Sequence, residues 1–175
     1  MADNGIPQMT WNIAQDLLTR GTSVWVRCGN SAADSQKVGF VDSMRGSKNL
    51  QLQRAQCCGS IVVVSIDPQG LSVQLNITGF VATKDVYKGS VEYNGGGKIS
   101  LASFNPKSKD FIENQVFTKF KYLDFYDEKH NTILASFKDA ISSTYTITVN
   151  GGSYVKADIS MEAIDMSDGT EYLNS

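Results

Sequence analysis

The stretch Leu71-Ser-Val-Gln-Leu-Asn-Ile-Thr78 alternates apolar and polar residues without a break. Successive side chains of a β-strand point to opposite faces of the sheet, so this pattern predicts a strand with one buried face. The other face carries small or medium-sized polar residues without charge: Ser72, Gln74, Asn76 and Thr78. Lysine and glutamate are usual on a face that only meets water. A smooth polar lining is one use of the face seen here.

Alternation elsewhere in the chain predicts a mainly β protein with antiparallel pairing. A hairpin is indicated where residues 145–149 alternate with threonines, Asn150-Gly-Gly supplies turn residues and residues 155–163 alternate again. Further strands are expected at 23–28, 38–43, 49–56, 60–65, 98–104, 119–126 and 132–141. The last of these also has helical spacing at Leu134, Phe137 and Ile141, and we favour a strand that pairs with the one before it.

Helical signals are fewer, and the chain length suits one domain. Asp110 and Glu113 can cap a short helix whose apolar stripe would be Ile112, Val116 and Phe120. A chain of 175 residues should bury about 70% of its unfolded surface, so a single self-sufficient core is expected. Within residues 1–175 we expect an N-terminal arm at 1–20, a basic loop at 43–58 and an acidic C-terminal segment at 164–175.

Composition and cysteine usage predict a cytoplasmic globular protein without metal or cofactor. The chain has 41% hydrophobic and 19% charged residues, no long apolar run and no secretion signal at its first residues. Three cysteines, Cys28, Cys57 and Cys58, make no disulfide framework, and one histidine leaves no four-ligand zinc set. Reduced thiols are expected, although Cys57 and Cys58 could also form inter-subunit links.

Charge is distributed unevenly although the net charge is only −2. The basic side chains of residues 37–54 are Lys37, Arg45, Lys48 and Arg54, opposed only by Asp42. After Lys156 the charged residues are all acidic: Asp158, Glu162, Asp165, Asp168 and Glu171. These two segments are either ordinary solvated surfaces or ends that attract each other between copies of the chain.

Catalytic motifs are not indicated. The segment Tyr122-Leu-Asp-Phe-Tyr-Asp-Glu-Lys-His130 holds the single histidine near two acids, but Asp124 and Asp127 are an odd number of positions apart in an expected strand and should face opposite sides. His130 would lie in the following turn. The loop Asn94-Gly-Gly-Gly-Lys-Ile-Ser100 lacks the first glycine of a phosphate loop and joins two expected strands. We therefore predict no catalytic residue.

Several segments together resemble a bacteriophage tail tube protein. They are the strand ending Leu75-Asn-Ile-Thr-Gly-Phe-Val-Ala82, the glycine loop, the short helix after Phe104-Asn-Pro106 and the closing Ser153-Tyr-Val-Lys-Ala-Asp-Ile-Ser-Met-Glu-Ala-Ile-Asp165. The resemblance covers most of the chain as an order of elements and a size. It implies an antiparallel β-sandwich or half-barrel with one short flanking α-helix. Six copies would join their sheets into a ring, and rings would stack head to tail into a DNA conduit.

The same resemblance implies the partners. They are further copies of the chain, a tail sheath, baseplate and tail terminator proteins, and genomic DNA that passes without sequence-specific binding; no membrane is involved. The protein would reside in the virion tail after assembly in the bacterial host cytoplasm, and the compact chain favours a contractile tail. Residues expected between rings are Arg45, Lys48 and Arg54 on one side and Asp165, Asp168 and Glu171 on the other. Ser72, Gln74, Asn76 and Thr78 are the candidates for the lumen.

Three alternatives stay open. The inner tubes of contractile injection and type VI secretion systems share this fold, so the fold does not choose between machines. A β-sandwich binding module is the second alternative, although Trp11 and Trp25 lie in an arm and a strand and not in loops, where binding aromatics are usual. A small hydrolase that uses Asp124 or Asp127 is the third.

Overall fold

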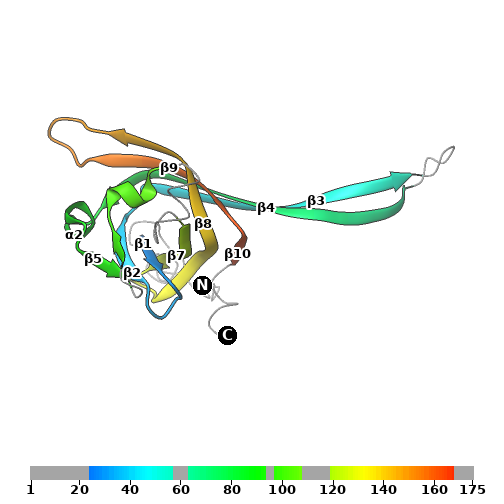
Figure 1. Cartoon of the computed structure of the whole chain (residues 1–175), viewed down its shortest axis with the longest axis horizontal. Coiled ribbons are helices and arrows are strands. Elements are labelled where there is room, and N and C mark those ends of the chain that lie inside the picture. Colours follow the sequence, from blue (N-terminus) through cyan, green and yellow to red (C-terminus); the bar gives the residue numbers. More distant parts are fainter. Residues whose placement is uncertain (1–23, 57–62, 94–96, 108–118, 168–175) are drawn as a thin grey trace, which may run out of the picture.

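Six strands close into an antiparallel barrel in the computed structural model, which describes residues 24–56, 63–93, 97–107 and 119–167 (Figure 1). Around the barrel the neighbours are β8, β7, β1, β2, β4 and β9, and β9 pairs with β8 again. The bounds of these strands are β1 Val24–Gly29, β2 Gln36–Phe40, β4 Val63–Ala82, β7 Lys119–Asp127, β8 Thr132–Thr148 and β9 Lys156–Ala163. The mainly antiparallel β class is confirmed.

The barrel interior is filled by side chains of these strands together with Phe104, which lies outside them. The fully buried side chains of greatest volume include Phe80, Phe104, Phe125, Phe137 and Leu75. Phe104 lies between Phe80 and Phe120, with ring centroids 5.1 and 4.9 Å away. Large buried aromatics of this kind contribute most of the apolar area that stabilises a small barrel.

Two further strands extend the barrel wall. Strand β3 (Ser43–Gln56) pairs with β4, and the three-residue strand β10 (Asp165–Ser167) pairs with β8. Residues 43–56 of the expected basic loop are therefore an edge strand. A small separate sheet is formed by β5 (Val91–Tyr93) and β6 (Gly97–Ile99).

Strand lengths differ from the sequence-based expectation. Residues 60–65 and 71–78 were expected as two strands, yet residues 63–65 and 71–78 belong to one 20-residue strand, β4. The intervening Asp67-Pro-Gln-Gly70 looks like a turn, but a register shift opposite Gln51 and Leu52 accommodates it. Among the described residues, this part of β4 pairs with β3 alone, and strands with one unpaired side are where proline occurs within sheets. Strand β8 likewise merges two expected strands and confirms the strand assignment of residues 132–141.

Helical structure in the described residues lies outside the positions that the sequence indicated. The helix α2 (Lys84–Lys88) follows β4, and the 3-10 helix η2 (Leu101–Phe104) replaces the second half of the strand expected at 98–104. Of the helix expected after Asp110, residues 110–118 lie outside the described part. Phe120 is the first buried residue of β7.

Two hairpins project from the barrel in opposite directions along the same sheet (Figure 1). Strand β9 pairs with β4 no further than Val73, so residues 63–72 of β4 pair with β3 alone. We call this β3–β4 projection the arm. At the other end, the pairing of β7 with β8 stops at Ile141 of β8, and β8 continues to Thr148 with β9 as its partner. We call the end of this hairpin, from Ile147 to Val155, the tip.

Candidate assembly surfaces

A polar face extends over four neighbouring strands, β3, β4, β9 and β8. The register pairs Ser47 with Gln74 and Gln74 with Glu162, and it pairs Asn76 with both Arg45 and Ser160. Directly opposed residues share a face of an antiparallel sheet, so these side chains form one surface. Thr144 and Thr146 continue this surface on β8 through their pairing with Ser160 and Asp158.

The predicted lining residues lie on this polar face. Gln74, Asn76 and Thr78 are exposed and Ser72 is half-buried, while Val73, Leu75 and Ile77 between them are buried in the barrel. Among the side chains that the structure describes, this face carries the cations Arg45 and Lys156 and the anions Asp158 and Glu162, and the Asp42 carboxylate lies beside Lys156. Lys156 is paired with Asp42 at 2.5 Å, and Asp158 accepts a hydrogen bond from the Gly79 N–H at 2.9 Å. The face is therefore polar without a strong field of either sign.

Within the part of the chain that the structure describes, both lateral edges of this four-stranded sheet are unpaired over part of their length. On one side β3 pairs only with β4, and short β10 approaches it near the base of the arm. On the other side residues 142–148 of β8 extend beyond β7. Unpaired strand edges present backbone N–H and C=O groups that can pair with another chain.

Apolar side chains are exposed at the two projecting ends. On the arm, Leu50, Leu52 and Leu71 are 55, 53 and 46% exposed. At the tip, Ile147, Val149 and Tyr154 are 49, 68 and 77% exposed. The alternation of Leu50 and Leu52 with asparagine and glutamine is a sequence signal for the first group, but their exposure follows only from the arm's extension past the barrel.

Of the residues expected between rings, the structure brings Lys48 and Asp165 together, and both belong to the same chain. Lys48 Nζ lies 2.6 Å from an Asp165 carboxylate oxygen and donates a 3.1 Å hydrogen bond to the Met166 carbonyl, so it connects the base of the arm to β10. Arg45 is exposed on the polar face. The side chain of Arg54 and residues Asp168, Glu171, Cys57 and Cys58 lie outside the described part.

The two acids near the histidine have separate partners. Both Asp124 oxygens accept hydrogen bonds from Arg27, at 2.8 Å from Nε and 2.6 Å from Nη2. Asp127 contacts His130 Nδ1 at 2.6 Å and accepts a 3.0 Å bond from the Lys129 N–H. His130 lies in the turn between β7 and β8, as predicted.

Burial sets the electrostatics of the Arg27–Asp124 pair. Asp124 is fully buried, and burial raises the pKa of its carboxyl although Arg27 opposes the shift. Burial, with the Asp124 charge as a smaller influence, also raises the pKa of Tyr122 above its usual range. A carboxylate held in a two-bond contact with arginine is a structural ion pair, without an open position for a substrate.

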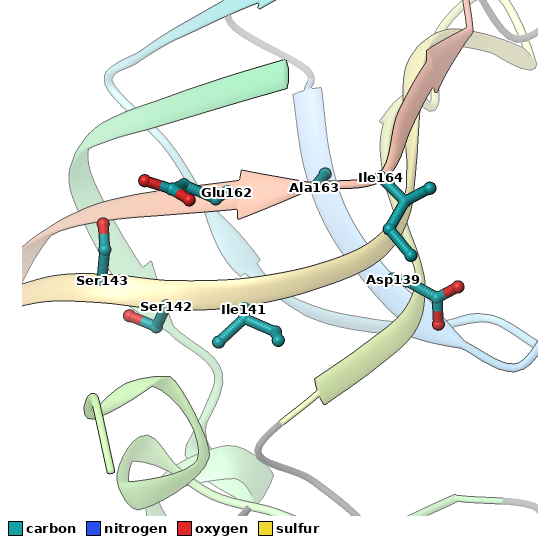
Figure 2. Close-up of a pocket in the computed structure, with 7 residues that line it drawn as sticks. All are labelled: Asp139, Ile141, Ser142, Ser143, Glu162, Ala163 and Ile164. Carbon is teal, nitrogen blue, oxygen red and sulfur yellow. The ribbon is translucent and has the colours of Figure 1, made fainter. Parts of the chain in front are cut away.

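A hollow of about 360 Å³ lies between β8 and β9, where Figure 2 shows Asp139, Ile141 and Glu162 among its lining residues. Ser142, Ser143, Ala163 and Ile164 complete the lining. Asp139 is engaged by Lys119 at 3.2 Å. Among the described residues no His, Cys, Asp and Glu side chains group as a metal site would require, and no helix is long and apolar enough to cross a membrane.

Comparison with known proteins gives structural similarity alone, since no family model and no curated protein matches the sequence. The chain is similar to a protein in the tail of an empty gene transfer agent particle refined with C6 symmetry, with 8% identity, 86% of this chain and 98% of that chain covered, and a TM-score of 0.48. A protein of the native gene transfer agent virion gives 8% identity, 86% and 98% coverage, and a TM-score of 0.47. A protein in the PVC sheath–tube complex of an extracellular contractile injection system, in its extended state, gives 12% identity, 91% and 97% coverage, and 0.44.

Proposed function

We propose that this protein is the structural subunit of a phage tail tube, in which copies join side by side into a ring. The observation that carries the proposal is the four-stranded sheet of β3, β4, β9 and β8, with its polar face and two open lateral edges. One edge strand of one copy can pair with the other edge strand of the next. Such pairing would satisfy the open backbone groups that otherwise favour uncontrolled aggregation.

Strand direction supports this lateral join. The four strands alternate in direction, because β3–β4, β4–β9 and β9–β8 are all antiparallel pairs. With an even number of strands, β8 of one copy and β3 of the next also run in opposite directions when copies are related by rotation about an axis along the strands. A ring of any size therefore keeps an antiparallel sheet throughout.

The expected ring size leaves an open channel. Six copies would supply about 24 strands, and at about 4.8 Å per strand the circumference is about 115 Å and the backbone diameter about 37 Å. A barrel of about 8 strands is filled by its own side chains, whereas one of about 16 to 18 leaves an aqueous channel. The polar face would line this channel and the single-chain barrels would surround it.

Further parts of the proposal follow from the open channel. Rings would stack head to tail into a tube that conducts genomic DNA, and a polar lining of mixed charge suits passage because phosphate-binding cations would retain DNA. We propose a surrounding contractile sheath, with baseplate and tail terminator proteins at the ends, in a virion tail that is assembled in the bacterial cytoplasm.

Charge attraction between rings is proposed for Arg54 with Asp168 and Glu171, since Lys48 and Asp165 pair within one chain.

Electron microscopy of the purified protein tests the proposal directly. Negative-stain images should show rings with a central hole or stacked tubes, and native mass spectrometry should give six copies per ring. A protein that stays monomeric at every concentration examined would end the proposal and favour a monomeric binding module.

A further inference from the structure

We propose that neighbouring copies within a ring are held in place by an ion pair between Arg45 of one copy and Glu162 of the next. This inference rests on the proposed tube function and names the side chains that would meet where β8 of one copy lies beside β3 of the next. Arg45 lies on β3 and Glu162 on β9, and both belong to the polar face. Arg45, which the sequence suggested as a contact between rings, would thus act within a ring.

The other charged side chains described on the polar face have partners inside the chain. Lys156 forms an ion pair, and Asp158 accepts a hydrogen bond from a backbone N–H. Arg45 and Glu162 are exposed, and within the described part of the chain the side chain of neither forms an ion pair or a hydrogen bond. These two opposite charges are therefore available to a second copy.

Strand register places Arg45 at the height of the open β8 edge. Ser160 pairs with Asn76 on one side and with Thr144 on the other, and Asn76 pairs with Arg45. Arg45 and Thr144 are thus at the same height on the two lateral edge strands. When copies are related by rotation about an axis along the strands, Arg45 of the next copy comes beside Thr144, on the same face of the continued sheet.

The hollow between β8 and β9 lies next to this position. It includes Ile141, where the pairing with β7 stops, together with Ser143 and Glu162 (Figure 2). An arginine has an apolar stem and a cationic end that binds carboxylates well. The stem of an incoming Arg45 would lie over Ile141, and its guanidinium would reach the Glu162 carboxylate.

Within one chain the same two residues are separated by β4. Arg45 lies opposite Asn76 and Glu162 lies opposite Gln74, and these two exposed side chains of β4 stand between the charges. Two strand spacings and two residues along the strands separate the charges by about 12 Å at the Cα atoms. Across the joint between copies the spacing is similar, but there the hollow lies between the charges and gives the arginine room.

The two charges also select which edges join. Pairing of β3 with β3 of a second copy would bring two Arg45 side chains together, and pairing of β8 with β8 would bring two Glu162 side chains together. Like charges that face each other disfavour a wrong partner. A contact between two different edges repeats around an axis and can close into a ring.

Charge reversal tests this contact. The variants are Arg45→Glu, Glu162→Arg and the double variant with both changes. The matched controls are Lys121→Glu on β7 and Glu92→Arg on β5, which make the same reversals at exposed positions outside the four-stranded face. All are assayed as full chains by thermal unfolding, native mass spectrometry and negative-stain microscopy.

Each single reversal of Arg45 or Glu162 should fold like the wild type but should form less than about a tenth of the wild-type amount of rings at the same concentration. The double variant should form rings again. An equal mixture of the two single variants should also form rings, in which the variants alternate, because every joint then brings opposite charges together. Both controls should form rings like the wild type.

The mixture separates a contact between copies from one inside a chain, since an ion pair inside a chain would be repaired by the double variant and not by mixing. Normal rings from either single variant, or no rings from the mixture, would overturn the inference and leave the proposed function intact. A wild type that forms no rings would overturn the proposed function as well.

Discussion

At the scale of single residues, Arg27 and Asp124 show what stabilises the wall of the barrel away from the polar face. They lie opposite each other on β1 and β7, with side chains 15% and 0% exposed. Arg27 also stacks over the Tyr126 ring, 4.1 Å from its centroid. Removal of one member of a buried pair leaves an uncompensated charge, which costs far more than the pair itself contributes.

We therefore expect Asp124→Asn to lower the free energy of unfolding by about 3 kcal/mol. The double variant Arg27→Met with Asp124→Leu should lose less, because no buried charge is then left alone. Urea denaturation at pH 7 measures both. Equal or greater loss in the double variant would show that the pair contributes through more than its charges.

A second residue, Asp34, makes stability depend on pH through the turn between β1 and β2. Burial is the largest single influence and raises the pKa of this carboxyl, but hydrogen bonds from Ser31 and Asn30 together lower it below its usual value. A lowered pKa in the folded state means that the group stabilises the fold above its unfolded pKa of about 3.9 and loses that contribution as the pH falls through the folded pKa.

Asp34→Asn should therefore reduce stability at pH 7 and have a smaller effect near pH 2.5. The expected loss at pH 7 is under about 1 kcal/mol, because the side chain is partly exposed to solvent. Denaturant midpoints of both proteins across this pH range measure the difference. A difference that stays constant with pH would assign the effect to the turn geometry and not to the charge.

At the scale of elements, Gly79 lies where β4 changes its register against β9 and begins to pair with β2. Its φ is +67°. It lies between Ile77 and Phe80, and the pairing register of β4 with β9 shifts between these two residues. Directly after Phe80, β4 pairs with β2. A Cβ atom there would lie 2.2 Å from an Asp42 oxygen and 2.8 Å from the Asp42 Cβ. Both backbone strain and the neighbouring side chain therefore favour glycine.

Gly79→Ala should destabilise the fold by about 1 to 3 kcal/mol, the cost of a strained backbone conformation with a clash. Adding Asp42→Gly should restore the part that is due to the clash and leave the part that is due to φ. Asp42→Gly alone controls for the exposed ion pair with Lys156. Calorimetric unfolding measures all three, and an unchanged melting temperature for Gly79→Ala would contradict the interpretation.

At the scale of the whole molecule, the proposed lumen makes a prediction about DNA. Asn76→Lys adds one exposed cation per copy on the polar face, and each ring would then carry several facing the channel. Wild-type tubes should not retain duplex DNA at about 0.15 M salt, whereas variant tubes should retain it with an affinity that falls steeply as salt rises. Fluorescent DNA that sediments with the tubes measures this retention.

Gln36→Lys is the matched control, since it places the same charge on an exposed position of β2, outside the four-stranded face. Similar retention by both variants would show that the polar face does not line the channel. Loss of tubes in the Asn76→Lys variant alone would instead place Asn76 in a contact between copies.

The sequence by itself determined the antiparallel β class, the polar and apolar faces of β4 and β9, and the turn at His130. Each of these depends on the alternation of neighbouring residues, which local geometry imposes. The tertiary structure decided the closed barrel, the union of expected strands into β4 and β8, the pairing of Lys48 with Asp165 inside one chain, and the exposure of Leu50, Leu52 and Leu71. Those features depend on where one strand ends beside another, and that point is set by pairing between residues far apart in the chain.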